Sequence, residues 1–107
     1  FYKTLDLDET EEEVKATAGQ VYGYYFFNAA ATTRYLKFYN ATAANVIVGT
    51  TVPDLTLPLP TVTAGHVPIP QGLAFGTAIT IAATTGLADN DTGAPAANDV
   101  VVMLFYK

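Results

Sequence analysis

The sequence predicts an all-β protein: an antiparallel β-sandwich, jelly-roll-like, with about eight short strands in a single domain over residues 1–107. Three observations favour this fold. Apolar and polar residues alternate in short segments, turn residues separate the segments every roughly 8–12 residues, and no alternation of strands with helical patterns occurs. The composition agrees, because sixteen threonines, seventeen alanines and no serine suit pleated strands and tight turns.

The first half of the chain contains four expected strands. They are expected at residues 4–8, 14–18, 21–28 and 34–39. The acidic run Asp8–Glu13 is interpreted as a loop or a single turn, and Gly19 and Gln20 as a turn. The strand at 21–28 is aromatic on both faces, with Tyr22, Tyr24 and Phe26 opposite Val21, Tyr25 and Phe27. The next strand, 34–39, is expected to be its hairpin partner.

The second half is expected to supply the remaining strands. They are expected at residues 46–52, 55–60, 67–75, 77–85 and 100–106. Prolines interrupt the segments 55–60 and 67–75, and proline cannot donate to a β-ladder, so edge positions are expected there. The last segment is apolar on both faces, which is typical of a central or covered strand. Between the last two strands, residues 85–99 form a long loop that we expect to make contacts.

The charge balance disfavours several classes of partner. Ten acidic residues against five basic ones give a net charge of −5 and a pI near 4.4. Such a surface repels phosphate backbones and anionic lipid, so neither nucleic acid nor a membrane is expected as a partner. No apolar run reaches the roughly 18–20 residues that span a bilayer.

The residue inventory also disfavours catalysis. Serine and cysteine are absent, and His66 is the single histidine, so no Ser/His or Cys/His pair can form. His66 lies between glycine and proline residues, as in an exposed turn. The carboxylates of the acidic run Asp6–Glu13 lie close together in a polar loop, whereas glycoside hydrolysis needs two carboxyl groups in different environments. We therefore expect no enzyme and assign no catalytic residue.

One segment partly matches a calcium-binding loop. Asp89 and Asp91 alternate ahead of Gly93, as at the start of such a loop. A further oxygen ligand before the glycine and a later glutamate are missing, so an Asx-type turn is the favoured interpretation. No metal site or cofactor is assigned.

The aromatic residues are the remaining candidates for binding. They are Tyr22, Tyr24, Tyr25, Phe26, Phe27, Tyr35, Phe38 and Tyr39. Aromatic rings can stack on sugars, but rings clustered on neighbouring strands more often form a core or a subunit interface. We expect the strands at 21–28 and 34–39 to pack subunits.

Several strand-and-turn patterns resemble a known family. They are Val14–Gly23, Tyr35–Asn40, Val48–Pro53, Gly72–Phe75, Thr84–Asp89 and the closing Asn98–Lys107. Together they resemble small β proteins encoded among the structural genes of tailed phages and prophages. None of these patterns is a catalytic signature.

The resemblance implies a non-enzymatic virion protein on the outer surface of the capsid. Its most specific form is a cement or decoration protein that binds the major capsid protein or another virion protein, as a dimer or trimer. Two alternatives use the same surfaces differently. One is an adhesion or carbohydrate-binding module of a phage fibre or surface appendage, and the other is a filament-forming subunit.

Overall fold

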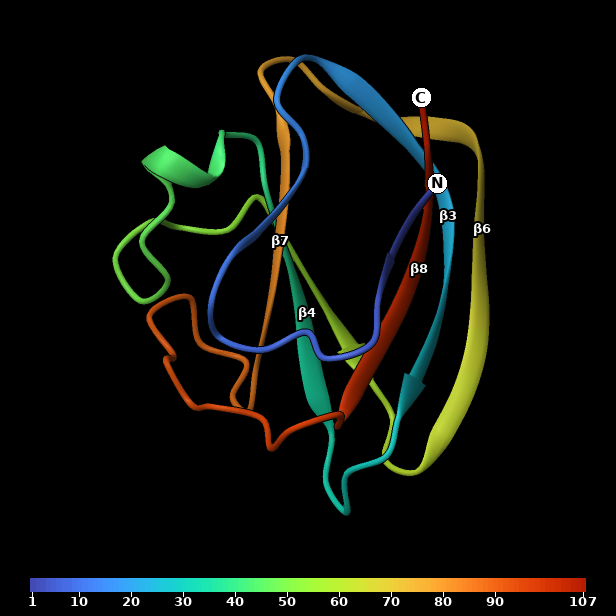
Figure 1. Cartoon of the computed structure of the whole chain (residues 1–107), viewed down its shortest axis with the longest axis vertical. Coiled ribbons are helices and arrows are strands. Elements are labelled where there is room, and N and C mark those ends of the chain that lie inside the picture. Colours follow the sequence, from blue (N-terminus) through green and yellow to red (C-terminus); the bar gives the residue numbers. More distant parts are fainter.

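The computed structural model describes all residues 1–107 as two four-stranded antiparallel sheets packed face to face (Figure 1). Sheet A has the strand order β1-β8-β3-β6, and sheet B has the order β2-β7-β4-β5. The strands are β1 (Tyr2–Thr4), β2 (Glu12–Lys15), β3 (Gly19–Asn28), β4 (Arg34–Tyr39), β5 (Leu55–Leu59), β6 (Thr63–Phe75), β7 (Ile79–Thr84) and β8 (Val100–Tyr106). The predicted all-β sandwich of about eight strands is confirmed.

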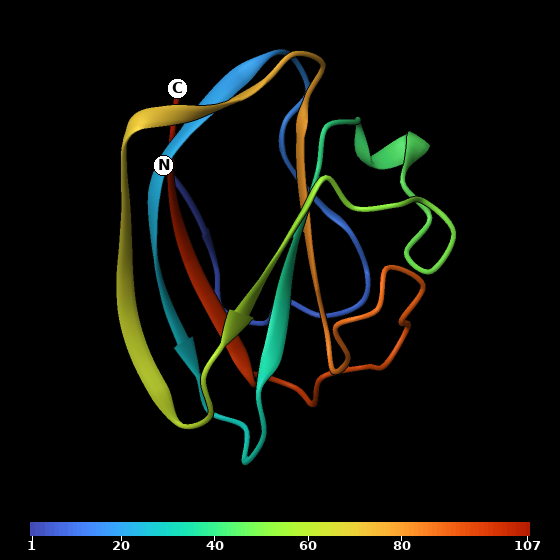
Figure 2. The ribbon, with the colours of Figure 1, turned by 180° about the vertical axis from the view of Figure 1, so that it is seen from behind.

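The pairing of the strands gives the jelly roll. Strand β1 pairs with β8, β2 with β7, β3 with β6 and β4 with β5, all antiparallel, as in one long hairpin whose two arms run alongside each other. This hairpin is rolled up, so that β8 also pairs with β3 and β7 also pairs with β4. The two chain ends therefore lie near each other beside sheet A, which the front and back views both show (Figures 1 and 2).

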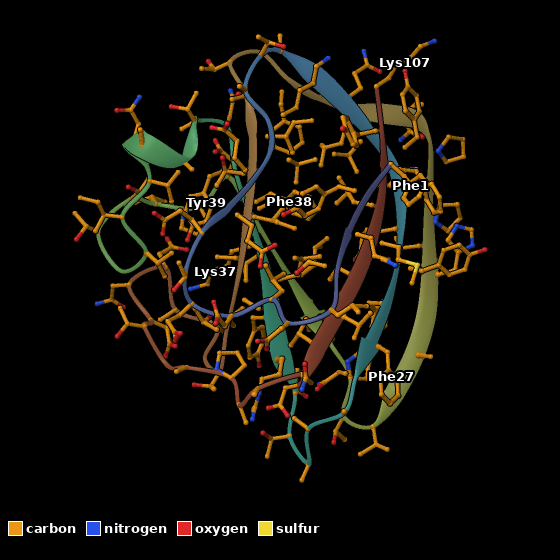
Figure 3. All side chains as sticks on the ribbon, in the orientation of Figure 1. Phe1, Phe27, Lys37, Phe38, Tyr39 and Lys107 are labelled. Carbon is orange, nitrogen blue, oxygen red and sulfur yellow. The ribbon has the colours of Figure 1, made fainter.

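One apolar core fills the space between the sheets. Its fourteen buried residues are Leu7, Val14, Val21, Tyr24, Leu36, Phe38, Leu59, Phe75, Ile79, Ile81, Ala83, Val100, Val102 and Leu104. Leu7 comes from the irregular segment between β1 and β2, and the other thirteen come from inward positions of the strands, as the period of two along a strand requires. Phe38 lies at the centre of this layer between the sheets, with its ring 5.9 Å from that of Phe75 and 6.4 Å from that of Tyr24 (Figure 3).

Several boundaries differ from the sequence prediction. The strand expected at 14–18 is Glu12–Lys15, so Glu12 and Glu13 of the acidic run lie in a strand and not in a loop. The strands expected at 67–75 and 77–85 are Thr63–Phe75 and Ile79–Thr84. The first strand is Tyr2–Thr4 and not residues 4–8, although Leu7 is buried in the irregular segment that follows. Gly19 and Gln20 begin β3 and are not a turn. The strand expected at 46–52 is absent. This segment follows a 3₁₀ turn at Ala43–Asn45 and contains only an isolated bridge between Val48 and Thr51.

The expected hairpin between residues 21–28 and 34–39 is wrong. Strands β3 and β4 lie in different sheets, and the connection between them crosses from one layer to the other. Asn28 stabilises this crossing from a fully buried position. Its amide nitrogen donates to the Leu59 carbonyl at 2.9 Å, and its amide oxygen accepts the Ala30 N–H at 2.9 Å. A polar residue that ends an aromatic strand is thus a structural anchor.

A β-bulge in β3 changes which side chains face the core. The register shifts between Val21 and Gly23, relative to both β6 and β8. Strict alternation places Val21 with Tyr25 and Phe27, but the bulge turns Val21 to the core beside Tyr24. Gly23 has φ of +147°, and a Cβ there would lie 2.8 Å from the Val67 carbonyl oxygen, so a side chain is excluded.

The proline-containing strands and the closing strand lie where the sequence predicts them. Strands β5 and β6 are edge strands, one in each sheet, and β8 lies between β1 and β3. At an edge, the missing N–H of proline can face solvent, so no hydrogen bond of the ladder is lost. The proline also discourages pairing with other chains.

The outer faces of the two sheets differ. Over sheet B, residues 40–54 and 85–99 form a cover, seen beside β4 and β7 in Figure 1. Tyr39, Val46 and Ala82 form a second small buried cluster beneath it, and Lys37 is fully buried as well. Figure 3 shows Lys37 and Tyr39 on this side of β4, opposite to Phe38. No comparable segment covers the outer face of sheet A.

Removing a central core side chain is expected to destabilise the fold strongly. Leu36 is fully buried in β4, and Leu36→Ala should lower the free energy of unfolding by about 2–5 kcal/mol, because it leaves a cavity between the sheets. Urea unfolding measures this. Leu87, which is 60% exposed, is the matched control, and Leu87→Ala should change the same quantity by less than about 0.5 kcal/mol.

Candidate docking face

The uncovered outer face of sheet A presents a regular apolar array, which we call the docking face. Strand pairing places its side chains in rows across β8, β3 and β6. The rows are Val101, Phe27 and Ala64; Met103, Tyr25 and His66; and Phe105, Gly23 and Pro68. Lys3 of β1 extends the middle row beside Met103.

Aromatic contacts hold the centre of the docking face in place. The Tyr25 ring stacks on His66, with ring centroids 4.2 Å apart, and meets Phe105 edge-on at 5.6 Å. Stacked and edge-to-face pairs of this kind stabilise one arrangement of the rings. Tyr25 nevertheless remains 47% exposed, Phe27 41% and Phe105 39%. These large apolar surfaces are thus ordered but remain in contact with solvent.

A shallow hollow of about 450 Å³ lies on this face. It is lined by Tyr25, Phe26, Phe27, Ala64, Gly65, Val101 and Met103. Five of these side chains point outward in the rows described above, and the two small positions on β6 keep the hollow open beside Phe27. Its walls carry one polar side-chain group, the Tyr25 hydroxyl, so the hollow suits an apolar group better than a sugar or an ion.

Charge is separated between the two sides of the molecule. None of the ten acidic residues lies in a strand of sheet A, where Lys3 and His66 are the only charged or imidazole side chains. The acidic residues lie instead in β2 and in the loops, among them Asp54, Asp89 and Asp91. The docking face is therefore apolar and free of carboxylates in a protein whose net charge is −5.

The structure divides the eight aromatic candidates into core and surface. Tyr24, Phe38 and Tyr39 are buried, and Phe26 and Tyr35 are half-buried, whereas Tyr22, Tyr25 and Phe27 are exposed. Strand β4 is a central strand whose last four residues are all buried, so the expectation that it packs subunits is wrong.

Sequence reasoning missed the contribution of the closing strand to this face. Met103 and Phe105 of β8 are exposed, although the apolar character of both faces of β8 suggested cover. The only sign of an exposed apolar face in the sequence was that both faces of this strand are apolar. That pattern is equally typical of a central strand and of a strand whose outer face binds a partner.

His66 lies in a strand and not in the expected turn. It belongs to β6 and stands opposite Tyr25 of β3. His66 packs against the Tyr25 ring, so its role in the structure is a packing contact. No carboxylate or further histidine joins it in a group that could hold a metal ion.

The Asp89 and Asp91 loop is organised by hydrogen bonds to its own backbone. Asp91 Oδ1 accepts the N–H of Gly93 at 2.8 Å and that of Gly86 at 3.2 Å, which is the Asx-type turn expected for Asp91. No group of three or more His, Cys, Asp or Glu side chains in the molecule could hold a metal ion. The same loop is attached to sheet B, because Lys37 Nζ donates to the Ala88 carbonyl at 2.7 Å.

Comparison with known proteins adds no match: no protein family, curated protein or solved structure is significantly similar to the chain. The resemblance to tailed-phage structural proteins therefore stays a prediction.

The one helical segment is the three-residue 3₁₀ turn, and no helix is long and apolar enough to span a bilayer.

Loss of the Asp91 carboxylate should loosen residues 85–99. Asp91→Ala leaves two backbone N–H groups unpaired, so we expect a loss of about 1–3 kcal/mol in the free energy of unfolding and faster proteolysis within the loop. Asp89 makes no side-chain hydrogen bond and is exposed, so Asp89→Ala is the matched control. Added calcium should leave the melting temperature of the wild type unchanged, and a clear increase would contradict the Asx-turn interpretation.

Strongly alkaline solution should destabilise the protein. Burial raises the pKa of Tyr24 and Tyr39, and burial together with the hydrogen bond to Glu12 raises the pKa of Tyr2 to about 12. The folded protein thus holds these protons more tightly than the unfolded chain, whose tyrosines titrate near pH 10. The free energy of unfolding should therefore fall as the pH rises from about 10 to about 12.

Lys37 acts in the opposite direction, because burial lowers its pKa below the ordinary 10.5 despite the nearby Asp91 and Asp89. Its contribution increases stability with pH only until the unfolded lysine has titrated, so above that pH the tyrosines alone set the slope. Urea unfolding at a series of alkaline pH values measures the decline, which should be shallower for Tyr2→Phe. A free energy of unfolding that stays constant over this range is the contrary result.

Proposed function

We propose that this protein is a non-enzymatic structural protein that acts by binding other protein surfaces. In its specific form, which follows the sequence resemblance, it is a capsid cement or decoration protein on the outside of a tailed-phage head. The jelly roll is compatible with this role, since viral capsid proteins use it, but lectins use the same fold. The proposal must therefore depend on the exposed surfaces and not on the fold.

The observation that carries the proposal is the chemistry of the exposed surface. The hollow on the docking face is lined almost entirely by apolar side chains, with no nucleophile beside a base and no cluster of ligands. Ordered aromatic residues and methionine are typical of the centre of protein interfaces. A substrate or sugar site would instead carry several convergent polar groups.

We place the contact with the capsid on the opposite side, at the cover of sheet B. Lys37 attaches residues 85–99 to the sheet, and Asp91 accepts hydrogen bonds from Gly86 and Gly93 within the loop, so these residues present a defined shape. Leu87 is 60% exposed in this loop and precedes Asp89 and Asp91 closely in the sequence. An exposed apolar residue with acidic neighbours suits an apolar depression bordered by basic groups.

The second candidate function is carbohydrate binding by a module of a phage fibre or surface appendage. The exposed Tyr25 ring, held by His66, favours it because such a ring can stack on a sugar. Filament formation, the third alternative, also needs exposed apolar strands, which the docking face supplies.

Co-sedimentation with capsid shells tests the proposal. The shells are those of the tailed phage or prophage whose structural genes lie beside the gene for this protein. We expect the protein to pellet with the shells at a fixed ratio per capsomer. Leu87→Glu should weaken binding by about tenfold or more, as loss of an interface anchor does. Val62, which is 67% exposed in the turn between β5 and β6, gives the matched control Val62→Glu, and its binding should be unchanged.

Two results would contradict the capsid role. One is protein that stays in the supernatant at every concentration of shells. The other is specific binding to immobilised glycans that Tyr25→Ala abolishes, which would favour the carbohydrate-binding module.

A further inference from the structure

We propose that the docking face binds the same face of a second copy of this chain, so that the protein is a two-fold symmetric dimer with two sheets A packed against each other. The inference goes beyond the proposed capsid role and does not depend on it. It commits the outer face of sheet A to one occupant.

The exposed apolar area is the first argument. Exposed fractions are 47% for Tyr25, 41% for Phe27, 39% for Phe105 and 36% for Met103. With roughly 200 Å² for a large side chain, these four residues alone expose about 330 Å². Val101, Ala64, His66 and Pro68 lie in the same rows and add to this area. Each partner contributes roughly 800 Å² to a stable interface of standard size, so the interface must extend over the rest of the outer face of sheet A.

The distribution of charge is the second argument, and it favours a second copy over a different partner. Two chains of net charge −5 repel each other wherever their acidic loops meet. Sheet A contains no acidic residue, so this is the side on which two copies can approach with least repulsion. Lys3 lies on the edge strand β1, away from the centre of the array, where a polar rim is expected.

Self-complementarity is the third argument. A two-fold interface uses one patch twice, so the patch must match its own chemistry. The docking face carries a hollow, of which Met103 is one wall, and beside it the exposed Phe105 ring, so each copy supplies a space and an apolar group suited to fill it. Two sheets packed in this way lie about 10 Å apart, with their side chains interdigitated.

Sedimentation equilibrium of the full chain over a range of concentrations tests the proposal. We expect a reversible shift from 11.3 kDa to twice that mass as the concentration rises. Phe27→Glu and Met103→Glu each place a carboxylate in the centre of the face, and we expect each to weaken dimerisation by about 100-fold or more.

Ile47→Glu is the matched control, because Ile47 is 63% exposed on the cover of sheet B. This variant should dimerise like the wild type. All three substituted side chains point away from the core, so circular dichroism and the melting temperature should show that each variant is folded. Should one of the two face variants fail to fold, the other still tests the proposal.

The outcomes separate the dimer from the capsid role. A wild-type protein that stays monomeric at about 1 mM overturns the dimer, since interfaces of standard size bind in the range of about µM to pM. A dimer that both face variants leave intact also overturns it, because another surface must then hold the copies together. If the protein is monomeric and Phe27→Glu abolishes pelleting with shells, the face binds the capsid and the dimer is wrong. A dimer that ignores shells supports the inference and contradicts the capsid role.

Discussion

The structure depends on how a two-layer sandwich treats its outer faces. The inner faces bury each other, but each outer face needs polar side chains, a cover or a partner. Sheet B has a cover, made by residues 40–54 and 85–99 and attached through Lys37. Sheet A has none, yet its outer rows are apolar and aromatic. This asymmetry gives the molecule one side made of ordered loops with acidic residues and another made of apolar strand.

Because of this asymmetry, the candidate binding sites of the molecule are exposed surfaces and not a cleft. The loops that cover sheet B use their polar groups to hold themselves in place, as Asp91 does with Gly86 and Gly93. The hollow over sheet A is apolar and shallow. A jelly roll can carry a capsid contact or a lectin site, so the fold leaves that choice to the side chains. Here the side chains favour protein contacts, and the two sides are suited to different partners.

Predictions from the sequence succeeded where a local pattern decides the structure. Prolines marked β5 and β6 as edge strands, and the double apolar face marked β8 as central. The predictions were wrong where contacts between residues distant in the sequence determine the structure. Residues 46–52 have the composition of a strand but cover Tyr39 and Ala82 as an irregular segment. Of the docking face, Tyr25 and Phe27 were among the sequence candidates, whereas Met103 and Phe105 were not, because exposure is a property of the assembled sheet.

By itself the sequence determined the fold class, the approximate number of strands, the edge positions and the lack of a Ser/His or Cys/His pair. These follow from period, proline chemistry and residue inventory, which are local or countable. Only the tertiary structure decided that β3 and β4 belong to different layers, that a bulge at Gly23 turns Val21 inward, and which aromatic rings reach solvent. Alternation separates two faces of a strand, but the packing of the sheets decides which face meets the core.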